Sequence, residues 1–211
     1  MPNKERQSPY AFGGTENDVR RYQQEFVPYF RGCKNVLDIG SGRGLFLELL
    51  KEEGIDGYGI DIFQSVVEEF KKKGLNALAV DVFEYLEKTD DKYDGIFCAH
   101  VVEHFSYENA MRLMTSANRV LNDNGLLIIV LPNPDSLRVS NMIFWLDPTH
   151  IRMYPALLLK DMLRITGYAV IRQGSIEKFN NIINLLRRLV ESVVRMKIVG
   201  TNLYVVAKKV A

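Results

Sequence analysis

The sequence of 211 residues contains only two cysteines, Cys33 and Cys98, and only three histidines. Two cysteines are too few for a disulfide framework, and they lack the paired spacing of a zinc site. The longest strongly apolar run covers residues 126–131, far short of the roughly 18 to 20 residues that span a bilayer. These absences argue against a domain stabilised by disulfide bonds and against a membrane-spanning protein.

The sequence also lacks an excess of either charge, because 27 Lys and Arg residues face 26 Asp and Glu residues. A duplex nucleic-acid binder usually needs a strongly basic face, so we expect no nucleic-acid partner. The first six residues mix charges with no apolar segment behind them, which does not resemble a secretory signal. Together with the scarce cysteines, this predicts a cytoplasmic protein.

What the sequence does contain is the composition of a globular protein, with 47% hydrophobic and 10% aromatic residues. From about residue 35, short β-type runs alternate with helical periodicity, which is typical of crossover units on a mostly parallel sheet. One α/β domain over residues 35–211 is predicted, preceded by a helical lid over residues 1–34 and interrupted by insertions at 133–154 and 177–198. Strands are predicted at 35–39, 57–62, 76–80, 93–99, 126–131, 168–172 and 202–208. Helices are predicted at 45–53, 64–73, 106–120, 156–166 and 178–197.

A glycine-rich turn follows the first predicted strand directly, in the segment V-L-D-I-G-S-G-R-G at residues 36–44. Glycines at such a turn let the backbone bend tightly and approach a ligand closely. Asp61 ends the second predicted strand about twenty residues later, where a carboxylate can accept hydrogen bonds from ribose hydroxyls. A strand, a turn, a helix and an acidic residue in this order indicate a cofactor that contains a nucleoside, rather than an ordinary turn.

The spacing G-x-G-x-G, with Asp38 two residues ahead of the first glycine, differs from the dinucleotide pattern G-x-G-x-x-G. A carboxylate at Asp38 would repel an anionic pyrophosphate and would suit a cationic ligand. This disfavours a nicotinamide-dependent oxidoreductase, which stays an alternative. A scaffold that binds the cofactor without turnover is a second alternative.

The segments V-L-D-I-G-S-G-R-G, Y-G-I-D-I and A-V-D-V together resemble the class I S-adenosylmethionine-dependent methyltransferases over roughly residues 12–172. The resemblance implies a Rossmann-like α/β fold with a seven-stranded, mostly parallel sheet, an antiparallel last strand and helices on both faces. It also implies S-adenosylmethionine as the cofactor. The positions that it assigns to cofactor binding are Asp38, Gly40, Ser41, Gly42, Arg43, Gly44, Asp61, Ile62, Asp81, Val82, Ala99 and His100. Within this set, Asp38 and the glycine loop lie along the methionine moiety, Asp61 binds the ribose, and Asp81 and Val82 flank the adenine.

The segment His100-Val-Val-Glu103-His104 matches H-x-x-E-H, a zinc-metallopeptidase signature. That site needs both histidines on one helix face, whereas this segment is predicted to cross from a strand end into a loop. We therefore expect no metal. The segment instead resembles the fourth motif of small-molecule class I methyltransferases, which implies that His100 lines the cofactor and that Glu103 or His104 faces the cleft.

The third histidine lies in the insertion, in the string D-P-T-H-I-R-M-Y-P at residues 147–155. So many polar groups in one loop suggest a site. His150 is predicted to be the general base, with His104 as the second choice, and Arg152 is predicted to hold an anionic group of the acceptor. The alternative is that Asp147 and Thr149 shape the turn around Pro148 and that His150 is structural.

This string, with P-N-P-D-S-L ahead of it, is similar to methyltransferases associated with bacterial and archaeal surface polysaccharides, O-antigen chain-terminating enzymes included. The similarity implies a small-molecule or glycan acceptor, either a sugar hydroxyl or a sugar-linked phosphate. Methylation of a quinone or another phenolic metabolite is the enzymatic alternative, because H-V-V-E-H also occurs in such relatives. The family usually joins its last two strands by a short hairpin, and the helix predicted at 178–197 departs from that pattern.

Residues 178–197 have apolar side chains at helical spacing and basic side chains opposite them. Such a helix packs on the sheet or cleft in the simplest interpretation. A peripheral contact with a membrane or glycolipid and a contact between copies of the chain are the alternatives.

Overall fold

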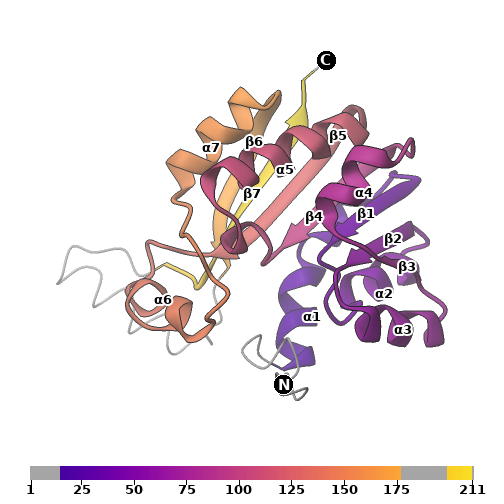
Figure 1. The fold of residues 1–211 in the computed structure, drawn as a ribbon, viewed down its shortest axis with the longest axis horizontal. Helices are drawn as coiled ribbons and strands as arrows, with labels where there is room; N and C mark the ends of the chain where they lie inside the picture. Colours follow the sequence, from indigo (N-terminus) through magenta and orange to yellow (C-terminus); the bar gives the residue numbers. More distant parts are fainter. Residues whose placement is uncertain (1–14, 177–198, 211) are drawn as a thin grey trace, which may run out of the picture.

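The computed structural model describes residues 15–176 and 199–210, in which seven strands form one sheet in the order β3-β2-β1-β4-β5-β7-β6 (Figure 1). The strands are β1 (Asn35–Ile39), β2 (Asp56–Asp61), β3 (Asn76–Ala79), β4 (Tyr93–Ala99), β5 (Leu121–Pro132), β6 (Tyr168–Ile176) and β7 (Asn202–Lys209). β7 runs antiparallel to both β5 and β6, and the remaining pairs are parallel. The predicted seven-stranded sheet with an antiparallel last strand is confirmed.

Helices cover both faces of the sheet, as predicted. They are α1 (Glu16–Gln24), α2 (Leu45–Glu52), α3 (Gln64–Lys72), α4 (Val82–Lys88), α5 (Tyr107–Val120), α6 (Leu137–Asn141) and α7 (Ala156–Ile165), with 3-10 helices η1 (Val27–Phe30), η2 (Val102–His104) and η3 (Ile143–Leu146). The apolar side chains of β1 belong to two separate core clusters, one on each face of the sheet, because successive side chains of a strand point to opposite faces. Leu37 and Ile39 pack with residues of α4, α5 and α7, whereas Val36 packs with residues of α1 and α2.

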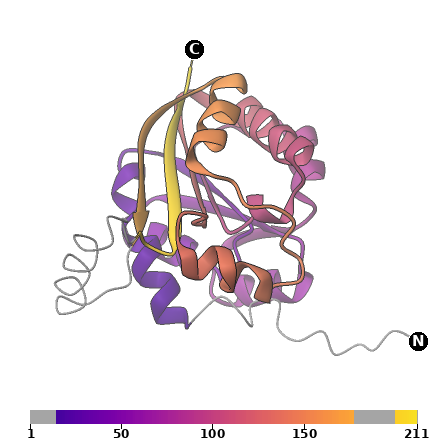
Figure 2. The same cartoon turned by 90° about the vertical axis from the view of Figure 1, so that its left-hand side faces the viewer.

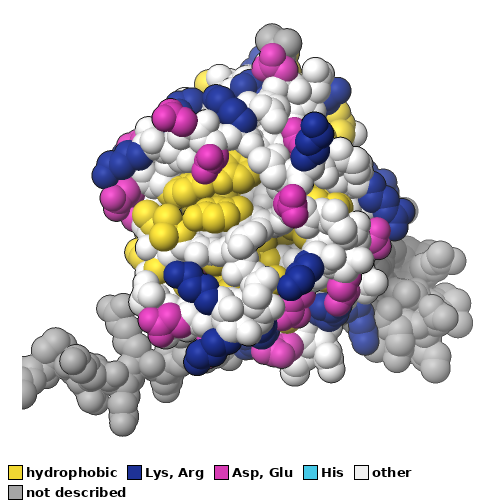
Figure 3. All heavy atoms as spheres, turned by 90° about the vertical axis from the view of Figure 1, so that its right-hand side faces the viewer, with side chains coloured by type: hydrophobic (Ala, Val, Ile, Leu, Met, Phe, Trp, Pro, Cys, Tyr) yellow, Lys and Arg dark blue, Asp and Glu magenta, His cyan; other side chains and the backbone are white. Residues whose placement is uncertain are grey.

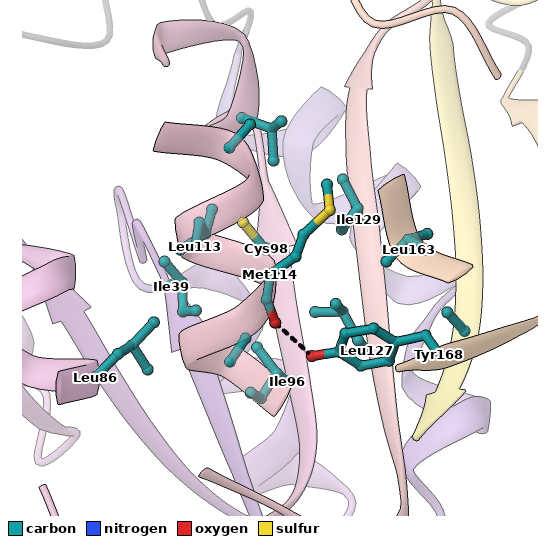
Figure 4. Packing of buried hydrophobic residues seen from close by; sticks show 14 of the residues in the cluster. Ile39, Leu86, Ile96, Cys98, Leu113, Met114, Leu127, Ile129, Leu163 and Tyr168 are labelled. Atoms are coloured by element: carbon teal, nitrogen blue, oxygen red, sulfur yellow. Dashed lines mark hydrogen bonds between the residues drawn. The ribbon is translucent and has the colours of Figure 1, made fainter. Parts of the chain in front are cut away.

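The α5 face of the sheet holds the larger apolar cluster, part of which Figure 4 shows. Met114 of α5 and Tyr168 of β6 meet there, among leucines and isoleucines of β4, β5 and α7. The Tyr168 side chain is buried, and its hydroxyl donates a hydrogen bond of 3.0 Å to the carbonyl oxygen of Met114. This bond fixes the position of α5 over the sheet.

Replacing Tyr168 by phenylalanine is expected to destabilise the protein by about 1 kcal/mol, because the buried ring keeps its packing and only the hydrogen bond is lost. For a chain of this size that loss lowers the melting temperature by about 2–4 °C. Thermal unfolding checks the shift, with Tyr107→Phe as the control because the Tyr107 hydroxyl makes no hydrogen bond with any described residue. Equal melting temperatures for the wild type and Tyr168→Phe would contradict the expectation.

Three local differences from the sequence predictions have physical reasons. β5 begins at Leu121 rather than at residue 126, because Leu121 pairs with Tyr93 before a register shift, although Asn124 keeps a turn-like φ of 64°. α4 is not predicted, since it has only seven residues. The stretch expected to be irregular up to residue 155 contains α6 and η3, two helices too short for a clear period.

The N-terminal segment from α1 through η1 packs against α2 and the sheet through its apolar side chains. Tyr22, Phe26 and Phe30 join Phe46 of α2 and Phe97 of β4 in the second core cluster. On its polar side, Arg20 of α1 contacts Glu52 of α2 at 2.6 Å. Figures 1 and 2 place α1 and α6 at the same end of the sheet, the end toward which the parallel strands point. The lid role of residues 1–34 stays a prediction.

The side of the molecule at the β3 edge of the sheet, on the right in Figure 1, shows hydrophobic side chains gathered among charged ones (Figure 3). Leu78 of β3 is 39% exposed. β3 has only four residues, and such a short edge strand offers few free backbone groups for pairing with another chain.

The segment between β6 and β7 is where the chain departs from a short hairpin, since β6 ends at Ile176 and β7 begins at Asn202. The helix predicted at 178–197 lies outside the described residues, and so do the contacts predicted for it. Within the described ranges, no helix is long and apolar enough to cross a membrane.

Candidate active site

The glycine loop joins β1 to α2 through three backbone positions that favour glycine. Gly40, Gly42 and Gly44 have φ values of +68°, +55° and +73°, in the left-handed region that other residues avoid. A Cβ at Gly40 would lie 2.4 Å from Cγ2 of Val101, so this position is closed to side chains on two grounds. The half-buried Arg43 lies between the last two of these glycines.

Ser41 ties this loop to the neighbouring strand. Its hydroxyl lies 2.9 Å from the carbonyl oxygen of Asp38 and 3.2 Å from that of Ile60, and it donates to this pair of acceptors. Gly59 of β2 makes room for the bond, because a Cβ there would lie 2.5 Å from the Ser41 hydroxyl oxygen. The sequence alone did not single out Gly59.

Asp61 holds the other side of the loop from the end of β2. Its carboxylate accepts hydrogen bonds of 3.0 Å from the backbone N–H groups of Gly42 and Phe63. These bonds order the glycine loop from the end of β2, and the ribose contact of Asp61 stays a prediction.

Asp38 is a buried carboxylate beneath this loop, with 2% of its surface exposed. Its Oδ2 atom has no hydrogen-bond partner among the described residues. Burial, followed by the nearby charge of Asp61, raises the pKa of Asp38 well above the usual value of an aspartate. A buried, unpaired carboxylate is costly unless a cation or a donor joins it, so the site fits a cationic ligand.

Ile62 lies after β2, and Asp81 and Val82, the two residues predicted to flank the adenine, lie after β3. Ile62 is 66% exposed, an unusual place for a large apolar side chain and a suitable surface for a flat ring. The Asp81 carboxylate caps α4 by accepting hydrogen bonds from the N–H groups of Phe83 and Glu84. Asp81 thus has a structural role that accounts for its position without a ligand.

Ala99 ends β4 and His100 follows it, at the same edge of the sheet as the glycine loop after β1. His100 has a φ of +56°, a strained conformation for a residue other than glycine, and such strain concentrates at functional sites. The Tyr22 ring of α1 packs edge-on against the His100 ring at 5.9 Å. Burial raises the pKa of Tyr22, a hydrogen bond with Gln23 lowers it, and the charges of Asp38 and Glu103 raise it further. No periodic signal in the sequence marks Tyr22 as a site residue.

Glu103 lies in η2, and its side chain is completely buried. Its Oε1 atom is 3.1 Å from Nδ1 of His100, and its Oε2 atom has no partner in the described part of the chain. Its backbone oxygen accepts hydrogen bonds from the N–H groups of Ile151 and Arg152. These two backbone hydrogen bonds connect the 133–154 insertion to the loop after β4.

His104 and His150 meet at this junction, with ring centroids 4.8 Å apart. His104 Nδ1 lies 3.2 Å from the Thr149 carbonyl oxygen and 2.9 Å from the Thr149 hydroxyl. The Thr149 hydroxyl donates to Asp147 at 2.6 Å. Asp147 is the residue that sequence reasoning treated only as turn-forming. Burial opposes its ionisation, but hydrogen bonds from Thr149 and the charges of His150 and His104 outweigh burial and lower the pKa of Asp147.

His150 is mostly buried, with 12% of its side chain exposed. Its Nδ1 atom lies 2.7 Å from the backbone oxygen of Phe144, so Nδ1 carries the proton and Nε2 offers a lone pair. Nε2 lies 4.0 Å from Oε1 of Glu103 and 3.9 Å from Oδ2 of Asp147. The hydrogen bond to Phe144 agrees with a structural role for His150. The lone pair of Nε2 is what a general base at His150 would require.

Arg152 is exposed, and its guanidinium lies over the rings of Tyr107 and Tyr154 at 5.8 and 5.7 Å. The Tyr154 hydroxyl donates a hydrogen bond to the carbonyl oxygen of Phe105. The two rings hold the guanidinium by cation–π contacts, while the exposed side chain stays accessible to a ligand.

Comparisons with known proteins agree with this geometry. Residues 13–173 match the model of a family described as a methyltransferase domain. A solved S-adenosylmethionine-dependent methyltransferase from Archaeoglobus fulgidus superimposes with a TM-score of 0.81 at 30% identity, over 95% of this chain and 97% of that one.

The chain belongs to the class I S-adenosylmethionine-dependent methyltransferases. This methyltransferase therefore has the cofactor that the glycine loop predicted, and the buried carboxylate of Asp38 fits the cation that the cofactor carries. More distant structures share the fold alone, such as magnesium protoporphyrin IX methyltransferase from Synechocystis PCC 6803 with bound S-adenosylhomocysteine, at 17% identity and a TM-score of 0.67 over 95% and 91% of the two chains.

Curated relatives of this methyltransferase match over a shorter stretch. An uncharacterised protein from Methanocaldococcus jannaschii is 32% identical over 102 residues, which cover 48% of this chain and 42% of the relative. A ubiquinone biosynthesis O-methyltransferase from Histophilus somni is 30% identical over 104 residues, which cover 44% and 43% of the two chains. The match thus spans less than half the length of these relatives, and it does not define the methyl acceptor.

Proposed function

We propose that the loop after β1 and the ends of β2, β3 and β4 bind S-adenosylmethionine, which supplies a methyl group on a positively charged sulfur. Asp38 faces the cationic side of the cofactor, and Asp61 accepts hydrogen bonds from the ribose. Ile62, Asp81 and Val82 lie along the adenine, and Ala99 and His100 lie at the reactive end. The unpaired, buried Oδ2 of Asp38 is the observation that carries this proposal.

Replacing Asp61 by alanine is expected to weaken binding of S-adenosylmethionine and S-adenosylhomocysteine by about 10²-fold, because it removes both the ribose acceptor and the bond to Gly42. Isothermal titration measures the change, with NAD as the control ligand. Asp56→Ala is the matched control, because Asp56 is an exposed aspartate at the opposite end of β2, and it is expected to leave both affinities unchanged. Tight binding of NAD with no response to either adenosyl ligand would overturn the cofactor assignments.

We propose that the acceptor atom is a hydroxyl oxygen of a small molecule. A hydroxyl is a weak nucleophile at neutral pH, and a base within hydrogen-bond reach accelerates its reaction by roughly 10² to 10⁴. Nε2 of His150 lies beside two carboxylates that stabilise a positive imidazolium, and His104 is the second candidate for this role. Holding the nucleophile in line with the methyl carbon is the other contribution of the cleft.

A phenolic acceptor is favoured by the apolar side chains that the insertion exposes beside His150. Trp145 is 64% exposed, and Met142 and Leu146 are about half exposed. Phe144 beneath them packs against the rings of both Trp145 and His150. Such a surface suits an acceptor with an aromatic or aliphatic body. The partial similarity to ubiquinone biosynthesis O-methyltransferases supports the same class.

A sugar hydroxyl or sugar-linked phosphate is the second candidate, and the accessible guanidinium of Arg152 favours it. Bidentate hydrogen bonds from an arginine are well suited to a phosphate, which is already anionic and needs no base. The expectation of a glycan acceptor from residues 147–155 rests on the sequence alone and belongs to the same class.

Methyl transfer from labelled S-adenosylmethionine to simple catechols and to nucleotide sugars separates the two acceptor classes. For a phenolic acceptor, His150→Ala is expected to lower kcat by about 10²-fold or more, while Arg152→Gln leaves it nearly unchanged. For a phosphate acceptor, Arg152→Gln is expected to raise KM and His150→Ala to have the smaller effect. Cofactor binding without turnover of either class would contradict the hydroxyl proposal.

A further inference from the structure

A cluster of metal-ligating side chains lies where the insertion meets the loop after β4. Glu103, His104 and His150 each offer a donor atom, and these three atoms lie within 4.8 Å of one another. Asp147 adds a fourth group, because its Oδ2 atom is 3.9 Å from Nε2 of His150. Two segments of the chain that are far apart in the sequence thus converge on one point.

The carboxylate of Glu103 is the strongest indication that something positive binds here. It is completely buried, and its Oε2 atom meets no hydrogen-bond donor among residues 15–176 and 199–210. Leaving a buried charged acceptor unsatisfied costs more than the ~1–3 kcal/mol of a neutral group. A cation at the cluster would remove this cost, because its charge would replace the lost hydration.

Both imidazoles have the outer contacts that metal-ligating histidines usually have. Nδ1 of His150 donates to the backbone oxygen of Phe144, and Nδ1 of His104 is within hydrogen-bond distance of the backbone oxygen of Thr149. Such bonds fix the tautomer and the orientation of the ring, and they leave Nε2 unprotonated as a potential ligand. Asp147 orders Thr149 in turn through a 2.6 Å hydrogen bond.

We propose that Glu103, His104 and His150, assisted by Asp147, bind one divalent transition-metal ion. Two imidazoles suit Zn²⁺ better than Mg²⁺ or Ca²⁺, which prefer sites made of oxygen atoms, and the two carboxylates also permit Mn²⁺. Two carboxylates balance the charge of such an ion. Ligand atoms at about 2.0–2.2 Å from an ion lie closer together than 4.8 Å, so binding draws the insertion toward the loop after β4.

This site differs from the metallopeptidase arrangement considered for H-x-x-E-H. η2 is a 3-10 helix of three residues, and His100 pairs with Oε1 of Glu103 instead of sharing a helix face with His104. The third ligand comes from the insertion, so sequence spacing does not predict it. The expectation that the protein uses no metal is revised by this proposal.

The proposal deepens the hydroxyl acceptor proposed above and rests on it for its catalytic consequence alone. With the ion bound, Nε2 of His150 is a ligand rather than a free base. A hydroxyl that coordinates the ion has a lowered pKa and releases its proton to water more readily at neutral pH. Two adjacent phenolic oxygens would fit an ion that keeps open positions.

Isothermal titration of the chelator-treated full chain with Zn²⁺, Mn²⁺ and Mg²⁺ tests the site. The wild type is expected to bind one Zn²⁺ or Mn²⁺ more tightly than Mg²⁺, and Glu103→Gln is expected to weaken this binding by about 10²-fold or more. His104→Gln serves as a second variant, because its side chain is only half buried and the change is easily accommodated. Glu108→Gln is the matched control, since it removes an exposed carboxylate near the same loop.

Thermal unfolding of the same samples adds a readout that a merely structural role would not move. The metal is expected to raise the melting temperature of the wild type and of Glu108→Gln, but not that of Glu103→Gln. Absence of stoichiometric binding by the wild type would overturn the proposal, and so would equal weakening in Glu108→Gln. Titration with S-adenosylmethionine on these samples keeps the outcomes separate, because loss of cofactor binding would count against the proposed function instead.

Discussion

Asp38→Asn is expected to weaken binding of S-adenosylmethionine by about 10²-fold, because it removes the carboxylate charge that faces the cationic side of the bound cofactor. The same change is expected to stabilise the ligand-free protein, since the neutral amide avoids burying a carboxylate without a partner. A loss of cofactor affinity together with a gain in stability would indicate that Asp38 serves ligand binding rather than folding. Titration calorimetry and thermal unfolding of the two proteins measure both effects.

The effect of Asp38 on stability depends on pH because burial raises its pKa in the folded state. A carboxyl group with a raised pKa stabilises the fold in its protonated form, so this contribution is complete below the ordinary pKa of an aspartate. It is lost as the pH rises through the raised pKa. The stability gain of Asp38→Asn is therefore expected to be larger at high pH than at low pH.

Cofactor binding to the wild type is linked to the same proton. A cation beside Asp38 favours the carboxylate, so binding is expected to release a proton wherever the ligand-free carboxyl is protonated, and affinity is expected to rise with pH in that range. Calorimetry in two buffers with different ionisation enthalpies measures the proton release. Equal affinity and equal stability in the wild type and Asp38→Asn would contradict the role of this carboxylate.

Gly40→Ala is expected to destabilise the protein by about 2–5 kcal/mol and to abolish measurable cofactor binding. The left-handed φ of +68° costs an alanine about 1–2 kcal/mol, and the clash of its Cβ with Val101 adds an overpacking cost of about 1–3 kcal/mol. Relief of the clash requires a shift of the loop that approaches the ligand. Thermal unfolding and titration with S-adenosylmethionine measure the two losses.

Gly54→Ala is the matched control, because Gly54 has a φ of +72° but no atom within 4 Å of an added Cβ. It is expected to lose only the backbone part, about 1–2 kcal/mol, with cofactor affinity unchanged. Adding Val101→Ala to Gly40→Ala is expected to restore about half of the lost stability. Equal effects of the two glycine substitutions would show that the contact with Val101 has no part in the loss.

The nucleotide-binding half of the molecule could be predicted from the sequence because its signals are local. The glycines of residues 40–44 need their φ values for a turn between adjacent elements, and Ser106 caps α5 by accepting from the N–H of Asn109. Both signals depend on neighbours a few residues away. The strand pattern from β1 to β4 follows from the same short-range periodicity.

The acceptor side could not be predicted in the same way, because its groups meet only through tertiary contacts. His104 and Thr149 are separated by 45 positions, and two hydrogen bonds to the backbone oxygen of Glu103 bring them together. Tyr22 reaches His100 because Tyr22 and the aromatic residues that follow α1 pack into the second core cluster. No periodicity in either segment encodes these distances.

The sequence by itself determined a nucleoside-binding site, since a strand, a glycine turn and an acidic residue at set spacing fix the backbone that a nucleoside cofactor needs, and its resemblance to class I methyltransferases implied the fold family and S-adenosylmethionine. Only the tertiary structure decided that Oε2 of the buried Glu103 has no partner among the described residues and that His104, His150 and Asp147 gather beside this side chain. The physical reason is that backbone turns are specified by nearby residues, whereas a converging polar cluster depends on how distant segments pack.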